Sequence, residues 1–328
     1  MFRKKPNFFY KKNVVVKLFL PLSWLYSFVF LILNIRLMRP KKIGKKVVCV
    51  GNIVVGGTGK TPLSCAICDV LQQRDKKVCF ITKGYGRTLK KTITIPVKHG
   101  DIFHHQETGD EALLLSDHAD TFVVNKRDAA KCGTYDVVIC DDGFFDNSIH
   151  KDCQIVVFDG SFFVGNSYAL PIGPLRAGLR SLKHADFVII ANANQDFEKQ
   201  SAILQRYLPA YKILQANSHV ASVHDKNKRY FAFSGLGENS KFINSLKEYG
   251  LDVVDSMGFE DHCHYNAEIF KRLEEAINRS GATGVITTAK DYVKIPKEVC
   301  AKFNLEVLEI SYSITDVSRI VEFIEQDV

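Results

Sequence analysis

The stretch Val47–Thr61, VVCVGNIVVGGTGKT, constrains the fold of this chain more than any other. Its first four residues form an apolar run typical of a buried parallel strand. A glycine-rich turn follows, and from Leu63 onwards the apolar residues recur at helical spacing. The sequence therefore predicts a strand, a glycine loop and a helix in direct succession.

This junction has the residues that a phosphate-binding loop needs, namely Gly56, Gly57, Thr58, Gly59, Lys60 and Thr61. Glycines let backbone N–H groups close on phosphates, and the helix N-terminus adds its positive dipole end. The lysine reaches the outer phosphates, and the threonine hydroxyl suits Mg²⁺. Val54 stands where the full pattern has another glycine. A plain glycine turn is the alternative, but Gly-Lys-Thr at a strand-to-helix junction favours a nucleotide-binding loop.

The first 46 residues differ in charge from the rest of the chain. They contain twelve Lys or Arg and no Asp or Glu, so the remainder carries the difference between +8 and +12, a net −4. This distribution favours an anionic membrane surface over nucleic acid as a partner. No stable protein partner is expected. The nine cysteines lie mostly in apolar runs, which indicates a reducing, cytosolic compartment.

Leu18–Ile35 is an uncharged run of eighteen residues with basic residues on both sides. This length is near the lower limit for a helix that spans a bilayer, and positive charge favours the cytoplasmic side. We therefore expect a monotopic, membrane-associated helix that lies at one leaflet. A cleaved signal peptide is the alternative, although the run is long for one and no small-residue cleavage site follows.

The body of the chain alternates short apolar runs with helical stretches. This pattern predicts an α/β fold like that of P-loop NTPases, with a mostly parallel sheet and helices on both faces. Besides the first strand, the expected strands are Val78–Thr82, Phe122–Val124, Val137–Cys140, Ile155–Phe158 and Phe187–Ala191, and the expected helices include Asp110–Asp117 and Lys126–Lys131.

Near Asn217 the pattern loosens and then restarts with strands such as Tyr230–Phe233 and Leu305–Ile310. We therefore expect three parts. Residues 1–46 form a membrane anchor, residues 47–216 a P-loop domain, and residues 217–328 a smaller α/β domain that closes over the nucleotide cleft.

Charged side chains follow several of the predicted strands. Asp141 and Asp142 end a strand, where phosphate-loop enzymes place an acid for Mg²⁺. Asp110 opens a helix, and its spacing alone indicates no more than a helix-dipole partner. Arg176 follows a Pro/Gly loop, where its paired N–H donors suit an anionic group or a solvated surface. His262 lies beside an aspartate and is a candidate for proton handling.

The segment Thr287–Asp291 follows a predicted strand and ends in Lys290-Asp291. This pair resembles the base-reading turn of GTP-binding switches, and it equally suits a helix cap. It leaves a second function open, that of a GTPase switch or metallochaperone with the same kind of loop.

Taken together, these segments resemble the tetraacyldisaccharide 4′-kinase family of lipid A synthesis over nearly the whole chain. The matching motifs are, in order, Val50–Asn52, Gly56–Pro62, Gly84–Arg87, Gly109–Glu111, Asp141–Gly143, Leu170–Arg176, Asp261-His262 and Thr287–Asp291. The family transfers the γ-phosphate of ATP to the 4′-hydroxyl of a tetraacylated glucosamine disaccharide 1-phosphate. It works at the cytoplasmic face of the bacterial inner membrane.

The resemblance implies ATP and Mg²⁺ as cofactors and an acylated glucosamine disaccharide lipid as the acceptor. It implies Asp110 as general base with His262 as its partner across a cleft, and Lys60 on the β- and γ-phosphates. Thr61 is expected on Mg²⁺ with Asp141 or Asp142, and Arg87 and Arg176 are expected on the substrate.

The chain departs from the family pattern at three places. Phe144-Phe145-Asp146 stands for Leu-Gln-His, Lys83 for Arg, and Ala177-Gly178 for Glu-Pro. These residues flank the expected substrate side, so the departures bear on substrate contacts rather than on phosphoryl transfer.

Overall fold

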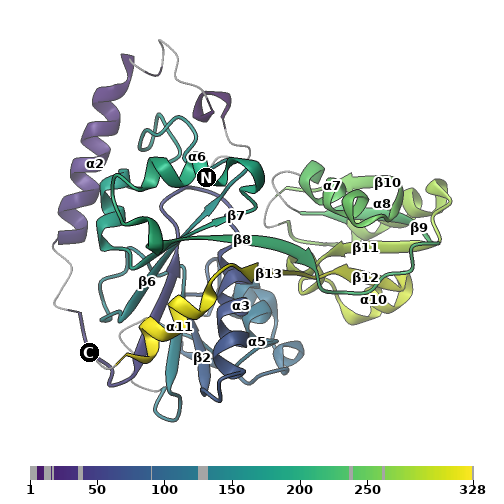
Figure 1. Cartoon of the computed structure of the whole chain (residues 1–328). Helices are drawn as coiled ribbons and strands as arrows, with labels where there is room; N and C mark the ends of the chain where they lie inside the picture. Colours follow the sequence, from purple (N-terminus) through teal and green to yellow (C-terminus); the bar gives the residue numbers. More distant parts are fainter. Residues whose placement is uncertain are drawn as a thin grey trace.

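The computed structural model describes residues 6–10, 16, 18–35, 40–89, 91–124, 132–235, 239–260 and 263–326. The described residues form a larger unit around a nine-stranded sheet and a smaller unit around a four-stranded sheet (Figure 1). The larger sheet has the order β13-β8-β7-β6-β1-β5-β2-β4-β3. Its strands are β1 (Lys46–Gly51), β2 (Val78–Thr82), β3 (Ile93–Ile95), β4 (Thr121–Val123), β5 (Val137–Asp141), β6 (Cys153–Asp159), β7 (Phe187–Ala191), β8 (Ile213–Val220) and β13 (Ile310–Ile314).

The larger sheet is parallel except at its two edges, where β3 and β13 pair antiparallel. Its central strands are apolar on both sides because helices cover both faces. Val48 and Val50 of β1 face the core under α3 (Lys60–Gln72), α5 (Asp110–Ser116) and α11 (Val317–Glu325), whereas Val47 and Cys49 face a second core. A third core includes residues around α6 (Phe197–Leu204), and Tyr26 of α2 (Leu20–Ile35) packs against it. The predicted mostly parallel, helix-covered sheet is thus confirmed.

Short helical turns complete this unit: η1 (Asn7–Phe9), η2 (Gly100–Ile102), α4 (His105–Thr108), η4 (Leu179–His184), η5 (Asn194–Asp196) and η6 (Ala210–Lys212). The expected helix Lys126–Lys131 lies outside the described residues.

The smaller unit contains the parallel strands β9 (Arg229–Ser234), β10 (Asp252–Gly258), β11 (Gly284–Thr288) and β12 (Leu305–Leu308), in the order β10-β9-β11-β12. Its helices are α7 (Asn239–Tyr249), α8 (Ala267–Ser280), α9 (Ala289–Tyr292) and α10 (Lys297–Phe303). Helix α8 begins at an asparagine cap, where Asn266 Oδ1 accepts a hydrogen bond from the Ile269 N–H at 3.0 Å.

The expected strand Leu305–Ile310 is wrong as a single element. The chain leaves β12 in the smaller sheet, passes Glu309 and enters β13, which pairs antiparallel with β8 of the larger sheet. It then continues into α11, which buries Ile320, Val321 and Ile324 in the larger core. Burial of this apolar helix face draws the C-terminus back to the larger unit.

The expected boundary between residues 216 and 217 therefore needs correction. It falls inside β8, and the last part of the expected smaller domain, from β13 onwards, belongs to the larger unit. Two paired strands, β8 and β13, thus connect the units (Figure 1).

Helix α2 lies along the outer side of the larger unit (Figure 1). Its Ser23 hydroxyl donates to the Ala169 carbonyl at 2.9 Å, and its Phe30 ring meets Phe145 edge-on at 5.0 Å. The opposite face is exposed and apolar, with Leu22, Trp24, Leu25, Phe28 and Val29. The expected helix forms; within the described part of the chain, no helix has the length and apolar character needed to cross a bilayer.

Candidate active site

The phosphate loop joins the end of β1 to the start of α3, as predicted. Gly56 (φ 101°) and Gly59 (φ 78°) adopt left-handed backbone conformations that side chains disfavour. The Asn52 side chain closes the loop by donating to the Thr58 hydroxyl at 3.1 Å. Val54 is fully buried and forms a β-bridge with Leu175, so packing explains the missing glycine there.

Asp141 is brought to the start of α3 by sheet pairing. It is the partner of Val50 in the β1–β5 register, so its side chain lies at the same edge as the phosphate loop. The Thr61 hydroxyl donates to Oδ2 at 3.0 Å and the Ser64 hydroxyl to Oδ1 at 2.9 Å. Burial raises the pKa of Asp141, while Lys60 and the two hydroxyls oppose the shift. Thr61 and Asp141 were predicted together; Ser64 was missed.

Asp142 lies between two cations at the mouth of the loop. Its Oδ1 is 3.9 Å from Lys60 Nζ and 3.7 Å from Arg176 Nη1, and its side chain is 46% exposed. Arg176 is fixed there by its backbone N–H, which donates to the Ile53 carbonyl at 2.7 Å. The structure thus places the predicted site residues Asp141, Asp142 and Arg176 beside the phosphate loop.

Asp110 lines a separate cavity of about 470 Å³. It is the first residue of α5, after Gly109, whose missing side chain allows close packing on Gly84 that follows β2. The lining residues are Tyr85, Gly86, Thr88, His105, Gln106, Gly109, Asp110, His264 and Lys294. Since β2 neighbours β5, this cavity lies at the same edge of the sheet as the phosphate loop.

The smaller unit contributes a buried lysine to this cavity. Lys294, with its side chain 1% exposed, lies 4.0 Å from Asp110 Oδ2 and 2.8 Å from Asp291 Oδ1. Asp291 also accepts hydrogen bonds from the Gly235 N–H and the Thr288 hydroxyl. Asp291 is fully buried and hydrogen-bonded to these partners. The segment Thr287–Asp291 therefore caps α9, which is the alternative to a base-reading turn. Sequence reasoning missed Lys294 because no motif marks it.

Two histidines also face the Asp110 cavity. His105 Nε2 is buried without a hydrogen-bond partner among the described residues, and burial lowers the pKa of its ring. His264 lies near it, with ring centroids 6.2 Å apart. The predicted partner His262, with Asp261, lies outside the described residues.

Arg87 has a structural position. Its Nη1 donates to the carbonyls of Lys91 and Val123, at 3.0 Å each, which ties its loop to β4. Its neighbours Gly86 and Thr88 line the cavity, whereas its own side chain is not among the lining groups. Its substrate-binding role stays a prediction.

Two departures from the family pattern contact each other. Lys83 Nζ lies 2.7 Å from Asp146 Oδ2, which joins the loop after β2 to the loop after β5. Phe145 meets α2 through Phe30. Three of the replaced residues, Lys83, Phe145 and Asp146, thus have contacts of their own in this structure.

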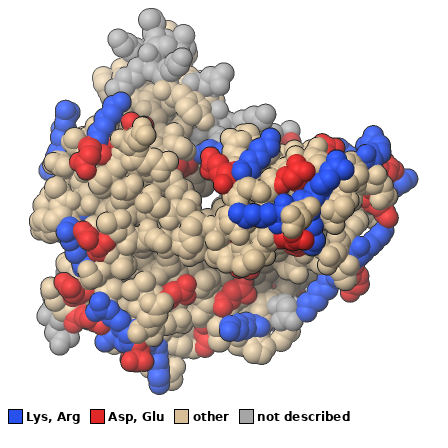
Figure 2. Space-filling model, turned by 45° about the vertical axis from the view of Figure 1, so that its right-hand side comes forward, with Lys and Arg blue, Asp and Glu red and all other residues tan. Residues whose placement is uncertain are grey.

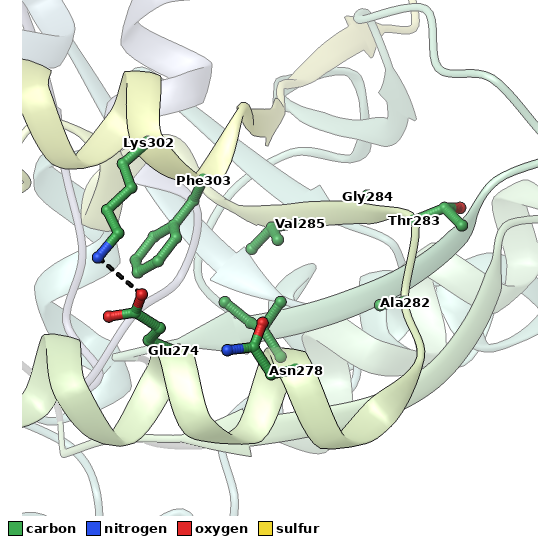
Figure 3. A pocket seen from close by; sticks show the side chains of 9 residues that line it. Glu274, Asn278, Ala282, Thr283, Gly284, Val285, Lys302 and Phe303 are labelled. Carbon is green, nitrogen blue, oxygen red and sulfur yellow. Dashed lines mark ion pairs between the residues drawn. The ribbon is translucent and has the colours of Figure 1, made fainter.

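A second cavity, of about 230 Å³, lies away from these groups in the smaller unit. Figure 3 shows it between α8 and α10, with Lys302 directed toward Glu274, whose Oε1 is 2.8 Å from Nζ. It lies at Gly284, where β11 begins, whereas ligands of parallel sheets bind at carboxyl ends of strands. On the face that Figure 2 shows, acidic and basic side chains are mixed over this unit.

Comparison with known proteins gives consistent matches. The sequence model of the family described as Tetraacyldisaccharide-1-P 4′-kinase matches residues 15–328. The tetraacyldisaccharide 4′-kinase of Rickettsia bellii is 35% identical over 295 residues, which cover 88% of this chain and 89% of that protein. The enzyme of the same name from Rickettsia canadensis is 35% identical over 294 residues, covering 88% and 87%.

A solved structure has the same fold. It is LpxK from Aquifex aeolicus in complex with ATP, with a TM-score of 0.75 over 95% of this chain and 98% of that chain. The sequences are 24% identical, so this likeness shows the fold.

Proposed function

The chain belongs to the tetraacyldisaccharide-1-P 4′-kinase family, and from this premise we propose how its residues carry out phosphoryl transfer. It is a kinase that phosphorylates the acylated disaccharide precursor of lipid A, with ATP as donor. The observation that carries the proposal is the common edge of the sheet. There the phosphate loop after β1, Asp141 at the end of β5 and the Asp110 cavity at the end of β2 follow one another along neighbouring strands.

ATP binds on the phosphate loop, with Lys60 on the β- and γ-phosphates. The Thr61–Asp141 pair and Asp142 suit Mg²⁺ because they supply the oxygen ligands that this ion prefers. Burial disfavours the ionised form of Asp141, and a bound cation would favour it. Bound there with the nucleotide, the ion neutralises phosphate charge. Arg176 supplies a further cation at the mouth of the loop, where charge on the transferred phosphoryl group develops.

Asp110 accepts the proton of the 4′-hydroxyl as the sugar oxygen attacks the γ-phosphorus, and the bond from that phosphorus to the β,γ-bridging oxygen breaks to release ADP. Lys294, 4.0 Å away and buried, favours the ionised carboxylate that a base requires. His262 is proposed as the group that orients this carboxylate or passes its proton on. Because Lys294 belongs to the smaller unit, closure of that unit over the cleft completes the surroundings of Asp110.

The exposed apolar face of α2 lies on the cytoplasmic face of the inner membrane. Trp24 and Phe28 are more than 60% exposed on that face, and basic residues such as Lys41 and Lys42 follow the helix. Such a face, with positive charges beside it, suits an anionic lipid surface. This placement brings the enzyme to an acceptor whose acyl chains stay in the bilayer.

The test is transfer of labelled γ-phosphate to an acylated glucosamine disaccharide 1-phosphate by the purified full chain. ATP and GTP are compared, with and without the lipid. We expect lipid-dependent incorporation from ATP and none in the Lys60→Ala variant. Acceptor-independent GTP hydrolysis without lipid labelling would instead indicate a GTPase switch, a function that the burial of Asp291 disfavours.

A further inference from the structure

Tyr312 lies over the phosphate loop although it comes from the far end of the chain. It is the central residue of β13 and packs against the apolar core that includes buried residues of α3. A Cβ atom on Gly59 would come within 2.8 Å of the Tyr312 hydroxyl oxygen. The hydroxyl therefore contacts the residue at which the phosphate loop becomes α3.

Asn192 lies beside this hydroxyl. It follows β7 with a left-handed backbone (φ 54°), and its Oδ1 accepts from the Ser218 N–H at 2.8 Å. Ser218 is the register partner of Tyr312 across β8 and β13. The Asn192 side chain lies close enough to the Tyr312 hydroxyl to oppose the rise in its pKa.

The hydroxyl remains a donor at physiological pH. Burial, and the negative charge of Asp159 at the end of β6, raise the pKa of Tyr312 to about 12. A neutral phenol next to the phosphate loop suits an anionic or hydroxyl oxygen acceptor.

The order of the strands decides which part of the nucleotide comes here. Asp141, Asp142 and the Asp110 cavity lie at the ends of β5 and β2, on one side of β1, where phosphoryl transfer is placed. Asp159 and Asn192 lie at the ends of β6 and β7, on the other side. With the γ-phosphate toward the acceptor, the nucleoside extends to the β6–β7 side.

We propose that Tyr312 is a nucleotide-binding residue whose hydroxyl donates to the α-phosphate or ribose of ATP. The proposal rests on ATP occupying the phosphate loop. It does not depend on which group takes the proton of the acceptor.

The test compares Tyr312→Phe with Tyr211→Phe, the control, because Tyr211 is 61% exposed on the surface. Affinities for a non-hydrolysable ATP analogue, ADP and inorganic tripolyphosphate are measured by calorimetry, with kcat, KM and the melting temperature alongside. We expect Tyr312→Phe to bind the analogue and ADP about tenfold more weakly, the worth of one hydrogen bond to a charged group. The KM for ATP should rise by the same factor while kcat stays as in the control, because the bond has the same strength in the ground and transition states. The melting temperature of the nucleotide-free protein should also stay as in the control.

The tripolyphosphate arm separates the two acceptors. Weaker tripolyphosphate binding assigns the bond to the α-phosphate, and unchanged binding assigns it to the ribose. Unchanged ATP-analogue affinity overturns the proposal, as does a loss for the analogue without a loss for ADP, or a fall in kcat that marks a distorted loop. Normal nucleotide affinities in a wild-type protein that labels no lipid would refute the lipid kinase assignment instead.

Discussion

The buried pair of Lys294 and Asp291 makes a prediction that can be worked out from its geometry. Lys294 Nζ is 2.8 Å from Asp291 Oδ1, and the two side chains are 1% and 0% exposed. Asp110 Oδ2 lies 4.0 Å from the same nitrogen. At an effective dielectric constant of about 20, the 2.8 Å pair attracts by about 6 kcal/mol and the 4.0 Å pair by about 4 kcal/mol. Desolvation of the ions, several kcal/mol each, offsets most of this gain.

Removal of the lysine charge alone leaves two carboxylates without their cation. We therefore expect Lys294→Met to lower the free energy of unfolding by about 3–5 kcal/mol, the usual cost of breaking a buried pair. At about 2–4 °C per kcal/mol, the melting temperature falls by about 10 °C. The matched control is Lys302→Met, because its pair with Glu274 has the same 2.8 Å distance but side chains 55% and 42% exposed. An exposed pair of this kind is worth about 0–1 kcal/mol.

The assay is urea unfolding of the full chain followed by circular dichroism, since the single tryptophan, Trp24, reports on α2 and not on the smaller unit. The double variant Asp291→Asn/Lys294→Met removes both charges of the pair and should recover part of the loss. If Lys294→Met costs no more than Lys302→Met, the burial argument is wrong. If the double variant is no more stable than the single one, the cost does not come from an uncompensated carboxylate.

Further predictions concern the site, the surface and pH. Asp110→Asn should reduce turnover by about 10²–10⁴-fold with unchanged affinity for an ATP analogue; full turnover would remove Asp110 from the role of base. Asp141→Asn should abolish transfer yet leave the apo protein at least as stable, because burial raises the pKa of this carboxylate and makes its charge costly; a large drop in melting temperature would contradict this. Replacing Trp24 and Phe28 by serine should weaken sedimentation with anionic vesicles while transfer to detergent-dispersed lipid persists. The hydrogen bond that His118 donates to the Asp69 carboxylate raises the pKa of the histidine. The stabilisation, at most about 1 kcal/mol for this part-exposed pair, is therefore present below pH 6.5 and lost as the pH rises through the folded value. His118→Gln should therefore destabilise the protein at pH 5.5 and have little effect at pH 9, as measured by urea unfolding at both values.

The phosphate loop and the carboxylate beside it were predictable from sequence, because each depends on a local pattern. A buried strand, a glycine turn and a helix start are specified by neighbouring residues. The carboxyl ends of adjacent parallel strands meet at one edge, so Asp141 falls beside Thr61 once the strands pair.

The tertiary structure alone decided which distant residues complete the site. Lys294 reaches Asp110 from the smaller unit, and Tyr312 reaches Gly59 because the chain returns to the larger sheet after β12. The apolar run Leu305–Ile310 reads as one strand, and no pattern within it marks the change of sheet. That change follows from the pairing of β13 with β8 and the burial of α11, which depend on surfaces formed by the rest of the chain. Local sequence thus specified the elements, whereas long-range packing specified their neighbours.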